Sequence, residues 1–207
     1  MSYADPGRKE AIWLACKQKR CCYTSFVLPT GRDVWRIAHS LQTHPETFLT
    51  YFESPQSRPD AFFLDASGRS FRIALAKQRS LRKSTPPCIF LLRTRNGYHR
   101  CGLGDLRPEV CKTYPTEIVS GVICIRNDGG CTCRTWTLQD IEIEDEMALV
   151  KSRTAEYHEY CDKVAVWNDM VLAAGETIHT FVEFCDFLVR TYDSPIEATY
   201  PSQTSHE

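Results

Sequence analysis

The chain has 207 residues, of which 43% are hydrophobic and 25% are charged, and its formal net charge is −1. This composition predicts one large domain, or one domain with a helical extension, that buries an apolar core. No stretch approaches the roughly 20 uncharged apolar residues that cross a bilayer, and residues 1–7 lack the pattern of a secretion signal, so we expect an unexported, cytoplasmic protein outside the membrane.

The cysteine content is high for a chain without an export signal, at 11 residues. Disulfides do not persist in a reducing compartment, so they would not stabilise the protein there. An odd number of cysteines also leaves at least one thiol unpaired in any intramolecular disulfide scheme. Metal binding is therefore the favoured use of these thiols.

Positive and negative charges are divided unevenly along the chain. Residues 1–115 hold 19 Lys and Arg against 9 Asp and Glu, whereas residues 116–207 hold 6 against 17. Nearby positive charge favours deprotonated sulfur, so the basic half suits thiolate ligands. The alternative is a solvated basic face, or one that docks on the acidic half.

Two short helices are predicted between residues 33 and 52. Apolar residues recur at helical spacing first at Val34, Ile37, Ala38 and Leu41, and then at Phe48, Leu49 and Phe52. Thr30 is a suitable N-cap for the first helix, and Pro45 fits the opening turn of the second.

Two β-hairpins are predicted to follow. Residues 61–64 and 71–75 are β-rich runs separated by a turn sequence. Residues 89–92 and 98–101 flank Asn96-Gly97, a dipeptide that favours tight turns. Cys88 and Cys101 flank this second hairpin, so we expect them to lie near each other.

The last part of the chain is predicted to be mostly helical. An apolar run over residues 118–125 predicts one buried strand, and the turn at residues 127–130 then leads to Cys131 and Cys133. Apolar residues at intervals of three and four predict two amphipathic helices, over residues 138–171 and 178–192. The polar tail from Ser194 is predicted to be flexible.

These elements predict an α+β fold. A cysteine-rich metal-binding region with short helices and β-hairpins would occupy residues 1–135. Two C-terminal amphipathic helices, within residues 136–193, would pack on it, and residues 194–207 would form the tail.

The cysteines divide into those expected in the core and those expected to bind metal. Cys161 and Cys185 occupy the apolar stripes of their helices, and Cys124 lies in the apolar run, so packing explains all three. Packing does not explain Cys16, Cys21 and Cys22, which lie among Lys17, Lys19 and Arg20. Cys131 and Cys133 follow a Gly-Gly turn and are typical of a metal knuckle.

A longer motif surrounds Cys88, Cys101 and Cys111. It consists of Pro87-Cys88-Ile89-Phe90-Leu91 and of the segment from Cys101-Gly102-Leu103-Gly104 through Arg107-Pro108-Glu109-Val110-Cys111 to Tyr114-Pro115. Over about residues 12–135 the chain resembles the YkgJ-like cysteine-cluster family, a zinc- or iron-chelating domain of the CxxxCxxCC type. The resemblance implies metal binding by the matching thiols.

The match is made residue by residue. Cys21 and Cys22 correspond to the paired cysteines of the family, Asp33 to its helix aspartate, and Cys88, Cys101 and Cys111 to its later cysteines. Gln18 and Lys19 stand where a further cysteine often lies, and Leu103-Gly104 replaces an Ile-Tyr pair, so Cys131 or Cys133 could replace one ligand. The candidate metal ligands are Cys16, Cys21, Cys22, Cys88, Cys101, Cys111, Cys131 and Cys133.

Two residues of the motif have alternative roles. Arg107 is either a cation that donates hydrogen bonds to a thiolate or to a backbone carbonyl, or part of a structural Arg-Pro turn. Asp33 either caps and anchors its helix near the metal, or is a solvent-exposed carboxylate in the first helical turn.

Thiolate ligands select zinc or iron–sulfur clusters over magnesium and calcium, but they do not choose between the two. The resemblance favours an iron–sulfur cluster of the 4Fe-4S type, with zinc as the alternative, because relatives of this domain occur in flagellin lysine methylase. The cluster would transfer electrons or support a redox or modification reaction on an unidentified protein partner. The zinc alternative is a non-enzymatic protein-interaction module.

Whether the chain is an enzyme stays open, because no catalytic residue can be named. The sequence lacks the common nucleotide-binding and hydrolase motifs. Basic residues around the hairpins would suit nucleic acid, but only Phe90 and Tyr98 supply aromatic rings there, so we do not expect a nucleic-acid partner.

Overall fold

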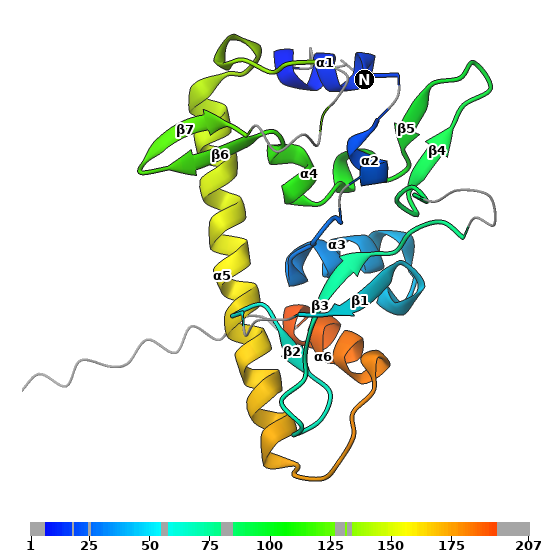
Figure 1. Ribbon diagram of the computed structural model, residues 1–207, viewed down its shortest axis with the longest axis vertical. Helices are drawn as coiled ribbons and strands as arrows, with labels where there is room; N and C mark the ends of the chain where they lie inside the picture. The colour runs from blue at the N-terminus through cyan, green and yellow to red at the C-terminus, as the bar shows by residue number, and fades with distance from the viewer. Residues whose placement is uncertain are drawn as a thin grey trace, which may run out of the picture.

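The computed structural model describes residues 7–17, 19–24, 26–54, 58–79, 85–126, 131 and 134–193 (Figure 1). Its α-helices are α1 (Arg8–Ala15), α2 (Cys21–Thr24), α3 (Gly31–Leu41), α4 (Glu109–Thr113), α5 (Ile143–Ala173) and α6 (Phe181–Asp193). Its strands are β1 (Leu49–Glu53), β2 (Phe62–Phe63), β3 (Ser70–Leu75), β4 (Leu91–Arg93), β5 (His99–Cys101), β6 (Thr116–Val119) and β7 (Val122–Ile125). Short 3-10 helices are η1 (Pro45–Thr47), η2 (Gly104–Leu106) and η3 (Leu138–Asp140). The α+β prediction is confirmed.

Helix α5 runs along one side of the molecule and contacts elements at both of its ends (Figure 1). Its 31 residues correspond to a rod about 46 Å long. Near its first half lie β6, β7 and α4, and near its second half lie β2 and α6. The cysteine-bearing segments therefore gather toward one end, and the aromatic core lies toward the other.

A three-stranded antiparallel sheet, ordered β1-β3-β2, has its edge strand β2 against α5 (Figure 1). Strand β1 pairs with β3 from Leu49↔Leu75 to Glu53↔Phe71. The edge strand β2 is held to α5 by Asn168, whose side chain accepts a hydrogen bond from the amide of Phe63 at 2.8 Å and donates one to the carbonyl of Ala61 at 2.9 Å. A helix side chain thus satisfies backbone groups that an open sheet edge would leave exposed.

The core forms where α3, the sheet, α5 and α6 meet. Phe62 of β2 stacks on Phe184 of α6 with ring centroids 4.0 Å apart, and Trp167 of α5 packs against the same phenylalanine. Fully buried residues from each helix complete the cluster, namely Val34, Ile37, Val164, Val171, Cys185 and Leu188. The packing prediction for Cys185 is confirmed, whereas Cys161 is only half-buried.

Several predicted elements are confirmed. Helix α3 begins after Thr30, which forms a capping box with Asp33. Both hairpins are present, as β2-β3 and β4-β5, and Gly97 has the positive φ that the tight turn of the second requires. The two amphipathic helices are α5 and α6. The turn at residues 127–130 and the tail from Ser194 lie outside the described residues.

The predicted helix after Pro45 is wrong. Pro45 does open a helical turn, but this turn is the short η1, and Leu49–Glu53 then forms strand β1. Thr50, Tyr51 and Phe52 are β-branched or aromatic, and pairing with β3 outweighs the helical spacing of the apolar residues.

The single buried strand predicted over residues 118–125 is also wrong. The run is a hairpin of β6 and β7, turning at Ser120 and Gly121, which both have positive φ. Two positive φ values match the tight turn that antiparallel strands favour. Val119 and Val122 beside the turn are more than half exposed, so the apolar run does not mark a buried strand.

Within the described ranges, no helix combines the length and the apolar character needed to cross a membrane.

Candidate metal centre

Five of the eight candidate ligands meet at one place in the fold. Cys21 and Cys22 lie in α2, Cys101 ends β5 and Cys111 lies in α4. These four line one cavity of about 580 Å³, which we call the thiol cavity. Cys88 lies beside it, because its backbone amide donates a hydrogen bond to the carbonyl of Cys22 at 2.7 Å.

The hairpin positions two of these thiols. Cys88 forms an isolated antiparallel bridge with Lys77, and the β4-β5 register places Cys101 opposite Leu91, three residues after Cys88. Burial raises the pKa of Cys88, and the negative charge of Cys101 raises it further. The expected closeness of Cys88 and Cys101 is confirmed.

Cys21 and Cys22 form a hydrogen-bonded thiol pair. The hydrogen bond from Cys22 and the positive charge of Lys19 lower the pKa of Cys21 to about 7, against the opposing effect of burial. The same hydrogen bond, burial and the negative charge of Cys21 raise the pKa of Cys22. Near neutral pH, Cys21 is therefore partly deprotonated to a thiolate, whereas Cys22 keeps its proton.

The remaining thiols of the cavity resist ionisation. Burial raises the pKa of Cys101. Burial also raises the pKa of Cys111, and the negative charges of Cys21 and Cys101 add to this effect. Such mutual repulsion means that these thiols become thiolates together only when positive charge is brought among them, which is what a bound metal supplies.

Two cations already lie beside the thiol cavity and enclose Trp13. The ammonium of Lys19 lies 3.7 Å, and the guanidinium of Arg107 3.8 Å, from the centre of the indole. Lys19 is buried with a left-handed φ of 46°, and it donates a hydrogen bond to the carbonyl of Trp13. Burying a charge costs free energy unless it has partners, and the carbonyl and ring of Trp13 are partners of Lys19.

Arg107 combines two of the roles proposed for it. Its Nε donates to the carbonyl of Gly104 at 3.1 Å, and its Nη2 forms an ion pair with Glu10 at 2.7 Å. Its positive charge lowers the pKa of Cys101, whose dominant influence is nevertheless burial. The backbone-carbonyl role is therefore confirmed, and the guanidinium also acts on a nearby thiol.

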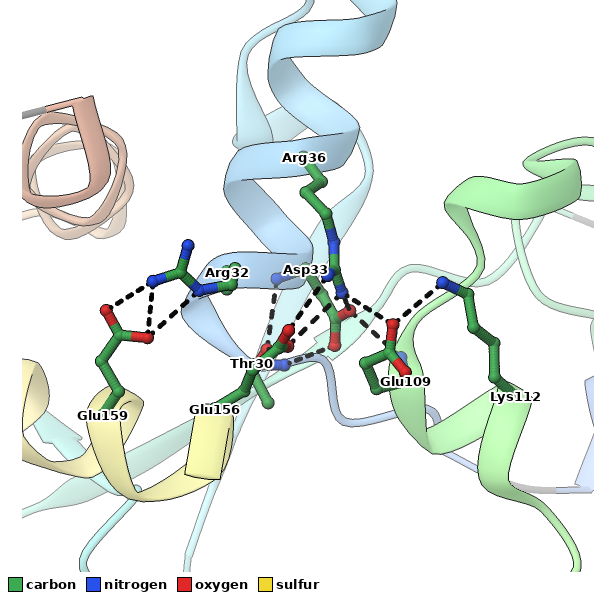
Figure 2. A network of polar contacts seen from close by, with 8 residues as sticks. All are labelled: Thr30, Arg32, Asp33, Arg36, Glu109, Lys112, Glu156 and Glu159. Carbon is green, nitrogen blue, oxygen red and sulfur yellow. Dashed lines mark hydrogen bonds and ion pairs between the residues drawn. The ribbon is translucent and has the colours of Figure 1, made fainter. Parts of the chain in front are cut away.

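Asp33 is a buried anchor and not an exposed first-turn carboxylate (Figure 2). Its carboxylate accepts a hydrogen bond from the amide of Thr30 at 3.0 Å, which caps α3, and one from the amide of Glu109 at 3.1 Å, which opens α4. One carboxylate thus joins the start of α3 to the helix that carries Cys111.

A network of charges extends this anchor to α5 (Figure 2). Arg36 contacts Asp33 at 2.5 Å, Glu109 at 3.2 Å and Glu156 at 3.0 Å. Lys112 also pairs with Glu109, at 2.9 Å. The position of Cys111 is therefore fixed by α3 and α5 together.

Of the other three candidate ligands, the structure describes two, and neither lines the thiol cavity. Cys16 lies close enough to Lys19 to raise its pKa, which burial lowers, but it does not line the cavity in the described structure. Cys131 is half-buried beyond β7 and does not line it either. Cys133 lies outside the described residues.

The spacing of the thiols bears on the kind of metal. Among the residues that the structure describes, no three Cys, His, Asp or Glu side chains are grouped closely enough to hold one ion. Sulfurs around one tetrahedral zinc lie about 3.8 Å apart, because each Zn–S bond is about 2.3 Å. In the part of the chain that the structure describes, the thiols are therefore not arranged as a closed zinc site.

The comparisons leave the family open. No protein-family model matches the chain, and neither curated proteins nor solved structures gave a match. The resemblance to the YkgJ-like family stays a prediction that rests on the quoted motifs.

Sequence reasoning missed Trp13 as part of the site. It lies in α1, which has no buried residue of its own, and no motif or spacing singles it out. Its role appears only when the fold brings both Lys19 and Arg107 into contact with its ring.

Proposed function

We propose that this chain holds an iron–sulfur cluster through thiolates of the thiol cavity, and that the cluster transfers electrons or supports a redox or modification reaction on a protein partner. The observation that carries the proposal is the meeting of five cysteines from three well-separated parts of the sequence. Candidate ligands are Cys21, Cys22, Cys88, Cys101 and Cys111. Four thiolates are the usual ligand set of such a cluster.

The surroundings of the cavity support this assignment. A cluster held by four thiolates carries negative charge, which buried cations offset. Lys19 and Arg107 provide such cations, and each is at most 6% exposed. Lys77, which is half-buried, also lies near these thiols: burial lowers its pKa, and the negative charges of Cys88 and Cys22 act in the opposite direction.

The second candidate is a zinc-stabilised interaction module. The same four thiols that line the cavity could close around one zinc ion if α2, α4 and β5 moved together. In that case the metal would hold the fold and would carry no redox chemistry.

Metal analysis after anaerobic purification separates the two. We expect brown protein that contains iron and acid-labile sulfide and has broad visible absorption. If the protein is colourless after anaerobic reconstitution and contains stoichiometric zinc and no sulfide, the zinc module is correct and the iron–sulfur proposal is wrong.

Single substitutions test the ligand set. We expect Cys22→Ala, Cys101→Ala and Cys111→Ala each to lower the iron content by at least half, because each removes a thiolate from the cavity. Cys161→Ala is the matched control, since Cys161 is half-buried on α5 and does not line the cavity. Normal iron in all three variants, or iron loss in the control, would contradict the assignment.

A further inference from the structure

The thiol cavity extends beyond the thiols along α5. Its lining continues from Cys111 past Arg153 and Tyr157 to Tyr160. Residues 153, 157 and 160 lie on one face of the helix because they are four and seven positions apart. A volume of about 580 Å³ is within the range of small-molecule sites, and it exceeds what water alone needs.

The charges that line the cavity are unbalanced. Five arginines line it, at positions 58, 72, 107, 126 and 153, against the carboxylates of Asp60 and Glu117. At the Tyr160 end the charges are satisfied, because Asp60 pairs with Arg72 at 2.5 Å. Arg58 also reaches Asp60, at 3.5 Å, and Arg107 pairs with Glu10 at 2.7 Å, so Arg153 is the lining arginine for which the described structure shows no ion pair.

Arg153 accounts for most of this excess. Its guanidinium donates to the hydroxyl of Thr113 at 3.2 Å, and in the described structure it forms no ion pair with a carboxylate. Its neighbour Arg126 is 3.7 Å from Glu117, so that carboxylate is already engaged. A half-buried guanidinium with only a hydroxyl partner retains donors for an anion.

Tyr160 supplies a second, independent sign of a ligand. It is 2% exposed, and within the described structure its buried hydroxyl has no hydrogen-bond partner. Buried polar groups are nearly always satisfied in proteins, so this hydroxyl needs a partner that enters the cavity. Arg153 and Tyr160 are seven residues apart, which is about 10 Å along the helix.

We propose that the cavity binds an elongated organic anion, with its carboxylate or phosphate on Arg153 and a hydrogen-bond acceptor on the hydroxyl of Tyr160. The ring of Tyr157, which lies between these two residues on α5 and also lines the cavity, covers the body of the ligand. The binding site adjoins the candidate metal ligands but is built from other residues, so it does not depend on the metal proposal.

Matched probe pairs test the charge requirement. Isothermal titration calorimetry on the anaerobically purified full chain compares hippurate with its neutral amide, and adenosine monophosphate with adenosine. We expect the charged member of one pair to bind at least tenfold more tightly than its neutral partner, because a charge-assisted hydrogen bond is lost in the neutral one. The pair whose charged member binds more tightly shows whether the anionic group is a carboxylate or a phosphate.

Three variants locate the site. Arg153→Gln should remove the preference for the anion, and Tyr160→Phe should weaken binding several-fold without lowering the unfolding temperature, because the hydroxyl has no partner to lose. Arg69→Gln, which changes an exposed arginine paired with Asp65, should bind as the unchanged chain does.

The outcomes that overturn the proposal are specific. Equal binding of charged and neutral members in both pairs, or a preference that survives Arg153→Gln, would show that the cavity is not an anion site. If Arg153→Gln fails to fold, the Tyr160→Phe variant decides the test. An unchanged affinity of this variant for the anion would mean that water, and not the ligand, pairs with the Tyr160 hydroxyl, which would overturn the proposed binding at two points. The iron content of the same samples tests the metal proposal separately, so a loss of anion binding is not mistaken for a loss of metal.

Discussion

Cys21 and Cys22 are adjacent in the sequence and yet behave oppositely as acids. The pKa of Cys21 falls to about 7 because Cys22 donates a hydrogen bond to it, whereas the pKa of Cys22 rises for the same reason. In a pair of this kind, one sulfur is a nucleophilic thiolate and the other remains a protonated thiol. The positive charge of Lys19 adds to this asymmetry by lowering the pKa of Cys21 further.

We predict that alkylation of Cys21 in the metal-free, reduced chain is half-maximal near pH 7. The thiolate is the reactive form, so the rate should rise as the pH rises through that value. A lowered pKa also stabilises the fold above the pKa of the unfolded thiol, and this contribution is lost as the pH falls through about 7. Mass spectrometry after timed iodoacetamide labelling measures the rate.

Two comparisons accompany this measurement. Cys22→Ala, which removes the hydrogen-bond donor, should move the midpoint for Cys21 upward, toward the ordinary thiol value of about 8.5. Cys185, whose pKa burial raises to about 12, should remain unlabelled in the folded chain. A midpoint for Cys21 above pH 8.5 in the unchanged chain would contradict the predicted pairing.

At the scale of elements, α4 is a helix of only five residues that carries a candidate ligand. A helix this short is not stable alone. It is held by Asp33 from α3 and by Arg36, which also reaches Glu156 on α5. The thiol cavity and the helical framework are therefore joined through side chains that do not belong to the cysteines.

We predict that Asp33→Ala lowers the free energy of unfolding by about 2 to 4 kcal/mol, because it removes a helix cap and leaves buried partners unpaired. Iron content should fall as well, since Cys111 loses the anchor of its helix. Urea unfolding and iron analysis measure the two effects. Asp65→Ala, in an exposed loop, is the control, and equal losses in both variants would remove the special role of Asp33.

The elements also show where sequence patterns succeed. The cap at Thr30 and the turn at Asn96-Gly97 are local chemistry, and both were predictable. The strand β1 was not, because its apolar spacing also fits a helix and only pairing with β3 decides between them. The β6-β7 turn at Ser120-Gly121 carried a usable signal, which the surrounding apolar run outweighed.

At the scale of the whole molecule, helix α5 packs against both the cysteine-bearing segments and the aromatic core. We predict that removing the metal increases hydrogen exchange in residues 12–135 more than in α5 and α6. Binding energy at a thiolate site is largely folding energy, because the unfolded chain has no preformed site. The second half of α5 and α6 keep their own packing through Trp167 and Phe184.

Hydrogen exchange of the metal-loaded and metal-free forms measures this difference. Equal protection of the cysteine-bearing segments in both forms would mean that the metal does not support the fold. The control region is α6, which packs on Trp167 through Phe184 and should keep its protection in both forms.

The sequence predicted part of the candidate site. Soft thiols in a motif pointed to Cys21, Cys22, Cys88, Cys101 and Cys111, and these five do gather in the structure. The contacts of Trp13 and the cavity beside Arg153 were not predictable, because they arise from elements that approach one another only in three dimensions. Long-range contacts of this kind leave no periodic pattern along the chain.

The distance in sequence between Cys21 and Cys111 also has a consequence for how the protein is made. A centre that needs both cannot be completed until the ribosome has added 90 further residues, and closing so long a loop costs conformational entropy. Until then the nascent chain carries adjacent thiols near its beginning, open to oxidation. Assembly of such a centre would therefore be a late event in biosynthesis, in competition with oxidants from the moment that α2 emerges.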